Sequence, residues 1–228
     1  MAELLTYELD GPVASITMDD GKVNVFSIPM LRSLHEAFDR AEADGALVLL
    51  SGREGYFSAG FDLKVVAGGE RDQIVEILTL GARLAERILS FPTPVVVACT
   101  GHAFPAGAFL LLSADLRIGA SGPFRIGLNE VRIGMTVPWF AIEIARQRLH
   151  PAAFDRTVVS AHMYGPEEAV TAGFLDQVVA PEALRPASLD AAAALSELDF
   201  AAHKVTKLRA RAGSLSALRS AIEKELGS

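Results

Sequence analysis

The chain has 228 residues, half of them hydrophobic, with 28 acidic and 21 basic side chains and a formal net charge of -7. This composition excludes a disordered chain, which would be poor in apolar residues, and the length suits one large domain or a domain with a helical appendage. The acidic balance, without a block of Lys or Arg, argues against nucleic acid as a partner, because polyanions are bound by basic faces.

Cysteine content and hydropathy narrow the class of protein further. The single cysteine, Cys99, excludes an internal disulfide and a multi-cysteine zinc site, and we expect no metal site. It lies in the apolar run 95–99, so we interpret it as a small core residue. Because no stretch reaches the roughly 18 uninterrupted apolar residues of a membrane span, and the first residues do not resemble a signal peptide, we expect a cytoplasmic protein without membrane contact.

The first third of the chain alternates strands with a helix. Residues 13–18 form a β-rich run after a turn signal. Ser27 then precedes a predicted helix with Pro29 in its first turn and apolar residues at helical spacing, and Gly45 can end it. Residues 46–51 are so uniformly apolar that they predict a strand buried on both faces.

The same alternation continues further along the chain. A long amphipathic helix is predicted over 71–90, an apolar strand over 95–99, a helix over about 107–114 and a strand over 116–119. Strands alternating with helices are typical of an α/β fold with mostly parallel strands.

Beyond Pro138 the pattern is almost entirely helical. Short helices are predicted over 139–149, 152–161 and 167–172, with a small strand at 174–179 and an Ala-rich helical tail from 182. Breaks in the tail are expected near Pro186 and Gly213. We therefore divide the chain into a core over 1–180 and a C-terminal helical region over 181–228.

Two Gly-containing loops each join a buried strand to a helix and are candidates for chemistry. The first carries Ser58, Ala59 and Gly60, and the second leads into Ala106 and Gly107. Helix N-termini present unpaired backbone N–H groups, so two such loops aimed at one point would form an oxyanion hole, and the small residues allow a ligand to approach closely. Turns of this kind are also common as purely structural elements.

Five segments resemble, in order, those of the crotonase (enoyl-CoA hydratase/isomerase) superfamily. They are KVNVFSIPML at 22–31, GYFSAGFDL at 55–63, TGHAFPAGAFLLLSADLRIG at 100–119, IGLNEVRIGMTVP at 126–138 and MYGPEEAVTAGFLDQVV at 163–179. The resemblance covers about residues 13–180. It implies a spiral of repeated ββα units followed by a C-terminal helical region.

The resemblance also implies an acyl-CoA thioester substrate, with coenzyme A as part of the substrate and no separate cofactor, and assembly as a homotrimer or hexamer. Its oxyanion donors fall on the backbone N–H groups of Phe61 and Ala106, with Gly107 as the alternative because Pro-Ala-Gly departs from the commoner triple glycine. The catalytic carboxylate falls on Glu130. Substrate-binding positions fall on Ser58, Ala59, Gly60, Asp62, Gly107, Phe109 and Asn129.

The carboxylates distinguish between reactions. Hydratases of this family use two glutamates to activate water, and here the first position falls on Phe109 and the second on Glu130. A phenylalanine cannot transfer a proton, whereas moving a double bond needs one acid/base group. Together with Pro138-Trp139, this favours a resemblance to the Δ3,Δ2-enoyl-CoA isomerases, which convert 3-enoyl-CoA to trans-2-enoyl-CoA. Phe109 would dry the site and raise the pKa of Glu130.

Two other functions stay open. An enoyl-CoA hydratase, which adds water to trans-2-enoyl-CoA, would need a second carboxylate, with Asp62 or Glu143 as candidates. A non-catalytic acyl-CoA-binding protein would keep the oxyanion loops and dispense with acid/base groups. Taken without the resemblance, Glu130 is a solvated loop carboxylate.

Four further charged residues and one histidine have mainly structural interpretations. We interpret His102 as a structural histidine, and Asp115 and Arg117 as a pair at a strand end. Lys204 and Lys207 either reach CoA phosphates or are surface charges.

Overall fold

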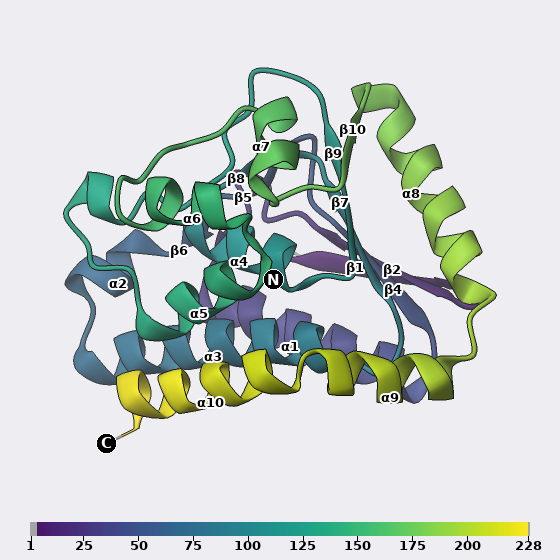
Figure 1. Cartoon of the computed structure of the whole chain (residues 1–228), viewed down its shortest axis with the longest axis horizontal. Helices are drawn as coiled ribbons and strands as arrows, with labels where there is room; N and C mark the ends of the chain where they lie inside the picture. The colour runs from purple at the N-terminus through teal and green to yellow at the C-terminus, as the bar shows by residue number, and fades with distance from the viewer. Residues whose placement is uncertain (1–3, 228) are drawn as a thin grey trace.

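A six-stranded sheet runs through the centre of the computed structural model, which describes residues 4–227 (Figure 1). Its strands, in spatial order, are β1 (Leu5–Asp10), β2 (Val13–Met18), β4 (Leu47–Ser51), β7 (Val95–Cys99), β9 (Leu116–Ala120) and β10 (Gln177–Val179). Only the β1–β2 pair in this sheet is antiparallel, and the other strands pair in parallel. The predicted α/β class is confirmed.

Successive units of two strands and a helix build the fold, and the second unit contains β6 and α2 in addition. Each begins with a strand of the large sheet (β2, β4 or β7) and ends with α1 (Ile28–Ala43), α3 (Arg71–Ser90) or α4 (Pro105–Ser113). The short strands between them form two separate parallel pairs, namely β3 (Val25–Phe26) with β6 (Gly60–Phe61) and β5 (Gly55–Ser58) with β8 (Gly101–Ala103). This is the predicted ββα repeat, and the short pairs bring the two Gly-containing loops together.

The central strands are buried on both faces, as their apolar runs predict. Leu47 and Leu49 of β4 pack toward α8 (Pro181–Ser196), whereas Val48 and Leu50 belong to the main core on the other face. The two-residue alternation of strand side chains sends neighbours to opposite faces, so a strand covered on both sides has no polar positions.

Helices cover the two faces unequally (Figure 1). Helix α8 lies against one face of the sheet, and α9 (Phe200–Ala210) and α10 (Ala212–Leu226) return across the other side, where α10 packs on α3 and α5. The remaining elements are α2 (Leu63–Gly68), the 3-10 helix η1 (Val131–Ile133), α5 (Trp139–Arg148), α6 (Pro151–Val158) and α7 (Pro166–Ala172). In the described part of the chain, no helix combines the length and hydropathy needed to cross a membrane.

Local signals place helix ends accurately. The Ser27 side chain accepts a hydrogen bond from the Met30 N–H at 3.3 Å, and Gly45 follows the helix with a φ of +64° that suits glycine. The long helix begins and ends at the predicted residues, Arg71 and Ser90. Helix starts and ends are therefore encoded locally here.

Two predictions about elements are wrong, and one strand was missed. Helix α8 continues through Pro186, because Leu184, Ser188 and Ala192 pack against the sheet and outweigh the lost backbone hydrogen bond. The strand expected at 174–179 starts only at Gln177, and β1 was not predicted. The division at residue 180 stays a prediction, although α8 begins next to it at Pro181.

The proposed pairing of Asp115 with Arg117 is also wrong, although both residues are structural. The Arg117 guanidinium binds Asp176 at 2.5 Å and donates to the Gly173 carbonyl at 2.8 Å. Asp115 accepts a hydrogen bond from Lys207 at 2.6 Å and forms an ion pair with Arg211 at 2.9 Å. Side chains two residues apart on a strand lie on the same face, which suggested the pairing, but Asp115 and Arg117 each bind residues of a distant segment instead.

Candidate active site

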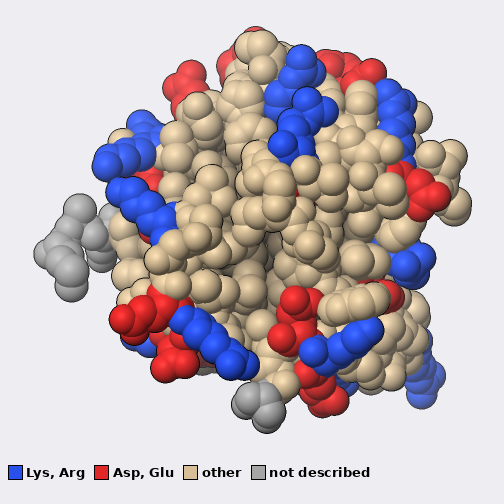
Figure 2. Space-filling view, turned by 90° about the vertical axis from the view of Figure 1, so that its left-hand side faces the viewer, with Lys and Arg blue, Asp and Glu red and all other residues tan. Residues whose placement is uncertain are grey.

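A pocket of about 400 Å³ lies between α2, α3, α4, the segment 129–138 and the last turn of α10. Its walls are mainly apolar, and they include Leu63, Val66, Leu78, Phe104 and Phe109. The face shared by α2 and the end of α10 is hollowed near its middle, and most atoms around the hollow are uncharged (Figure 2). Such a pocket suits an apolar chain whose reactive end meets a few polar groups.

The first Gly-containing loop places Phe61, the predicted first oxyanion donor, in the wall of this pocket. The Asp62 N–H donates to the Phe26 carbonyl at 3.2 Å, in the β3–β6 ladder that pairs Phe26 with Phe61. Since successive N–H groups of a strand point to opposite sides, the Phe61 N–H points away from β3. Gly60 and Phe61 both line the pocket.

The second loop leads into α4, whose first turn holds the predicted second donor. The first hydrogen bond within α4 runs from the Ala108 N–H to the Phe104 carbonyl, so the Ala106 and Gly107 N–H groups precede the helical ladder. A methyl group on Gly60 would lie 3.5 Å from the Ala106 nitrogen, so the start of α4 adjoins β6 directly. This geometry favours Ala106 over Gly107 as the second donor.

Glycine at position 107 meets a packing requirement instead. A Cβ there would lie 2.9 Å from the Ser58 Cβ, so only glycine lets α4 approach this closely. The Ser58 hydroxyl donates to the Asn24 carbonyl at 2.7 Å and accepts from the Gly60 N–H at 3.1 Å. Ser58 and Gly107 therefore shape the two loops from behind the pocket wall.

Glu130 is the buried titratable group of the pocket. Its side chain is 6% exposed, and neither carboxylate oxygen has a hydrogen-bond partner among residues 4–227. Burial raises the pKa of Glu130 to about 7, because desolvation disfavours the charged form. The carboxyl is thereby close to half ionised near neutral pH.

A tight turn holds Glu130 in place. Its backbone carbonyl accepts hydrogen bonds from the Ile133 N–H at 3.0 Å and the Met135 N–H at 2.9 Å. Gly134 closes the turn with a φ of +79°, a left-handed conformation that favours glycine. The turn directs a single carboxylate into an apolar pocket.

The residues expected around Glu130 divide into two groups. Ala59, Phe109 and Asn129 line the same pocket, and the Phe109 ring lies 6.4 Å from that of Phe61 and 6.0 Å from that of Phe140. Asp62 does not line the pocket. It caps α2 by accepting from the Lys64 N–H at 3.0 Å, so its contact with substrate stays a prediction.

Sequence reasoning missed one carboxylate of this pocket. Glu225, in the last turn of α10, lines the pocket and accepts a hydrogen bond from the Trp139 N–H at 2.7 Å. No motif marks it, because only the packing of α10 on α5 brings it there. The carboxylate that was considered on α5, Glu143, lies outside the pocket lining and faces Arg146 at 3.5 Å.

Two other candidates have structural surroundings. The His102 ring accepts a hydrogen bond from the Arg125 N–H at 3.0 Å and stacks on Phe104, as expected for a structural histidine. Lys207 is buried and bound to Asp115, so neither role considered for it, phosphate contact or surface charge, fits. Lys204 is exposed.

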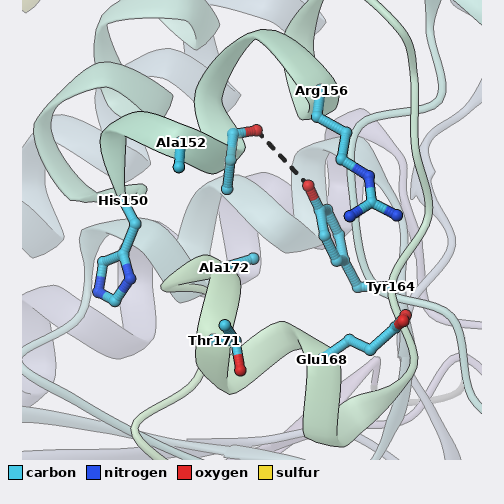
Figure 3. Close-up of a pocket in the computed structure, with 8 residues that line it drawn as sticks. His150, Ala152, Arg156, Tyr164, Glu168, Thr171 and Ala172 are labelled. Carbon is cyan, nitrogen blue, oxygen red and sulfur yellow. Dashed lines mark hydrogen bonds between the residues drawn. The ribbon is translucent and has the colours of Figure 1, made fainter.

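A second hollow, of about 380 Å³, lies between α6 and α7 (Figure 3). Arg156 and Tyr164 point into the space between the two helices, and the dashed line marks the hydrogen bond from the Tyr164 hydroxyl to the Ala153 carbonyl at 3.5 Å. The same hydroxyl is hydrogen-bonded to Thr157 at 2.8 Å. None of the predicted site residues lines it. Within residues 4–227, no three His, Cys, Asp or Glu side chains gather as metal ligands would.

Comparisons with known proteins identify the family of the chain. The family model described as enoyl-CoA hydratase/isomerase matches residues 8–227. The chain is 28% identical to human mitochondrial enoyl-CoA delta isomerase 1, over 90% of this chain and 70% of the relative. It is 29% identical to the carnitinyl-CoA dehydratase of Salmonella enteritidis, over 81% and 71%.

The fold is also shared with a solved structure at higher identity. A protein of the enoyl-CoA hydratase/isomerase family from Pseudomonas syringae is 48% identical, with a TM-score of 0.95 over 98% of this chain and 96% of that one. Together, the family match over nearly the whole chain and the shared fold show that the chain is a member of the enoyl-CoA hydratase/isomerase family, the crotonase superfamily.

Proposed function

We propose that this protein isomerises 3-enoyl-CoA thioesters to trans-2-enoyl-CoA thioesters. One observation carries the proposal: the carboxylate of Glu130 is buried and has no partner among residues 4–227, in a pocket that Phe61 also lines and whose Gly60 adjoins the Ala106 N–H group. A buried acid/base group beside two backbone donors is the minimum equipment for enolate chemistry.

The proposed reaction moves one proton between two carbon atoms of the acyl chain. The Glu130 carboxylate removes a proton from C2, next to the thioester carbonyl, and the electrons spread over a dienolate. Its oxygen accepts hydrogen bonds from the Phe61 and Ala106 N–H groups. The protonated Glu130 then gives the proton to C4, which leaves a double bond between C2 and C3. Coenzyme A leaves as part of the product, and no separate cofactor takes part.

The surroundings of Glu130 match this double role. A pKa of about 7 leaves enough carboxylate to remove a proton at neutral pH and enough acid strength to return it. Phe109, 2% exposed, excludes water from the pocket, which strengthens the hydrogen bonds to the dienolate oxygen.

Turnover of a purified sample tests the proposal directly. Incubation with a 3-enoyl-CoA should produce the conjugated thioester, measured by its ultraviolet absorbance and by chromatography. Glu130→Gln keeps the shape of the side chain and should lower kcat by about 100-fold to 10,000-fold. Glu143→Gln, which removes a carboxylate outside the pocket, is the matched control. Full activity of Glu130→Gln would refute the assignment.

Hydration of trans-2-enoyl-CoA is the second candidate, because a second carboxylate, Glu225, lines the pocket and one relative is a dehydratase. It would require Glu225 to activate water together with Glu130. Formation of 3-hydroxyacyl-CoA that is lost in both Glu130→Gln and Glu225→Gln would favour this reaction over isomerisation. Tight binding of acyl-CoA without turnover of either substrate would favour a non-catalytic binder.

We also propose that the protein works as a homotrimer or hexamer in the cytoplasm, without nucleic acid or membrane partners. Oligomeric assembly is typical of the family. Light scattering after size-exclusion chromatography should give three or six times the mass of one chain. The mass of a monomer would contradict the proposed assembly. It would not affect the test of the isomerase reaction.

A further inference from the structure

The last turn of α10 holds the first residue of α5. The Glu225 carboxylate accepts a hydrogen bond from the Trp139 N–H at 2.7 Å, and the Lys224 ammonium lies 3.3 Å from the centre of the Trp139 ring. Lys224 and Glu225 therefore both contact Trp139, which lies more than 80 positions earlier in the chain. We call these three residues the clasp.

The clasp supplies a hydrogen-bond acceptor that the residues next to the start of α5 do not provide. The N-cap of α5 is Pro138, whose side chain has no acceptor to cap the helix. The first N–H groups of a helix need acceptors, and a carboxylate there also interacts favourably with the helix dipole. Glu225 provides both from another element.

One residue of the clasp, Glu225, also belongs to the wall of the candidate active site. Glu225 and Pro138 line the pocket together with Glu130, and Thr136 between them lines it as well. The segment that runs from Glu130 to the start of α5 is therefore fixed at its far end by α10. A displacement of Trp139 would move this wall.

The body of α10 is anchored independently of the clasp. Leu215, Leu218 and Ile222 are buried, and Arg219 binds Glu86 of α3 at 2.6 Å. Glu225 and Lys224 are exposed, so their contacts are individually weak. The last turn can thus release Trp139 while the rest of the helix stays in place.

We propose that Glu225 is a positioning residue. Its hydrogen bond with the Trp139 N–H holds the acyl pocket closed and gives the pocket a preference for long acyl chains. The inference rests on the acyl-CoA binding part of the proposed function and not on isomerisation. An acyl chain long enough to reach the rim would contact the wall that the clasp holds, whereas an acetyl group would end near the oxyanion donors.

Binding of saturated acyl-CoA, which carries no double bond to move, tests the proposal separately from turnover. In Glu225→Ala, calorimetry should show Kd for decanoyl-CoA raised roughly three- to tenfold, with Kd for acetyl-CoA unchanged. Glu225→Gln keeps an oxygen acceptor and should restore most of the affinity. Glu223→Ala is the control, because Glu223 is exposed on the same turn and its side chain has no hydrogen bond or ion pair within the described residues.

The alternative outcomes are distinct. Equal weakening of decanoyl-CoA and acetyl-CoA, or no change in either, would overturn the proposal. A lower melting temperature of Glu225→Ala with the same chain-length preference would reduce Glu225 to a structural cap. If the wild type binds acyl-CoA without isomerising it, the isomerase assignment fails while the role of the clasp is still measured. If the wild type binds no acyl-CoA, both fail.

Discussion

The Lys207 ammonium donates to the Asp115 carboxylate at 2.6 Å, although 92 residues separate the two in the chain. The same carboxylate accepts a hydrogen bond from the Val95 N–H at 2.8 Å and forms an ion pair with Arg211 at 2.9 Å. Asp115 thereby joins strand β7 to α9 and to the start of α10. Because Lys207 is buried, its charge depends on this partner.

Asp115→Ala should therefore destabilise the protein strongly. It leaves the buried Lys207 without its acceptor and removes the ion pair of Arg211, which keeps its hydrogen bonds to the Leu89 and Ser113 carbonyls. Removal of one partner of a buried pair lowers the free energy of unfolding by about 3 kcal/mol or more. Chemical denaturation measures the change. Asp190→Ala, on the exposed side of α8, should change stability by less than about 0.5 kcal/mol. Equal stability of the two variants would contradict this role for Asp115.

Glu130→Gln should stabilise the fold at alkaline pH while it abolishes activity. The pKa of Glu130 is raised from 4.5 to about 7 in the folded protein, so the folded state holds the proton more tightly than the unfolded state. In the wild type, the contribution of Glu130 to the free energy of unfolding is fully present below pH 4.5, and it is lost as the pH rises through 7. The glutamine variant does not lose this contribution, so its free energy of unfolding should exceed that of the wild type by up to about 3 kcal/mol above pH 7. Unfolding curves at pH 5 and pH 8 compare the two proteins, and a gain that is the same at both values would exclude ionisation of Glu130 as its cause.

The pH dependence of the reaction should report the same group. Since proton removal needs the carboxylate, kcat/KM for a 3-enoyl-CoA should rise with pH and level off above an apparent pKa near 7. An ordinary, solvated glutamate would give a plateau already above pH 5. The profile of Glu143→Gln should match that of the wild type.

Gly60→Ala should impair the first oxyanion donor. Gly60 has a φ of +88°, and its added methyl group would lie 3.5 Å from the Ala106 nitrogen, in the space that the thioester oxygen would approach. The left-handed backbone would cost about 1 kcal/mol or more for alanine, and displacement of the Phe61 N–H should lower kcat about 100-fold. Gly68→Ala, where φ is not positive and no atom lies within 4 Å, is the matched control and should be nearly neutral.

Local pattern was sufficient for the principal helices and strands. The helix over Arg71–Ser90 follows from apolar spacing and the prolines after it, and α1 follows from Ser27 and Gly45. Strand β1 was missed because it lies at the sheet edge, where most of its side chains are exposed and only pairing with β2 makes it a strand. Pro186 predicted a break in the helix, but α8 continues through it because the helix packs on the sheet.

Motif order along the chain by itself indicated the family, the candidate oxyanion loops and Glu130. These features depend on short segments whose residues act close to where they lie in the sequence. The tertiary structure alone decided that Glu130 is buried without a partner, that Ala106 adjoins Gly60, and that Glu225 reaches the same pocket from the end of the chain. Burial, partner choice and pocket lining are set by the packing of distant segments, and no local pattern of residues encodes which segments meet.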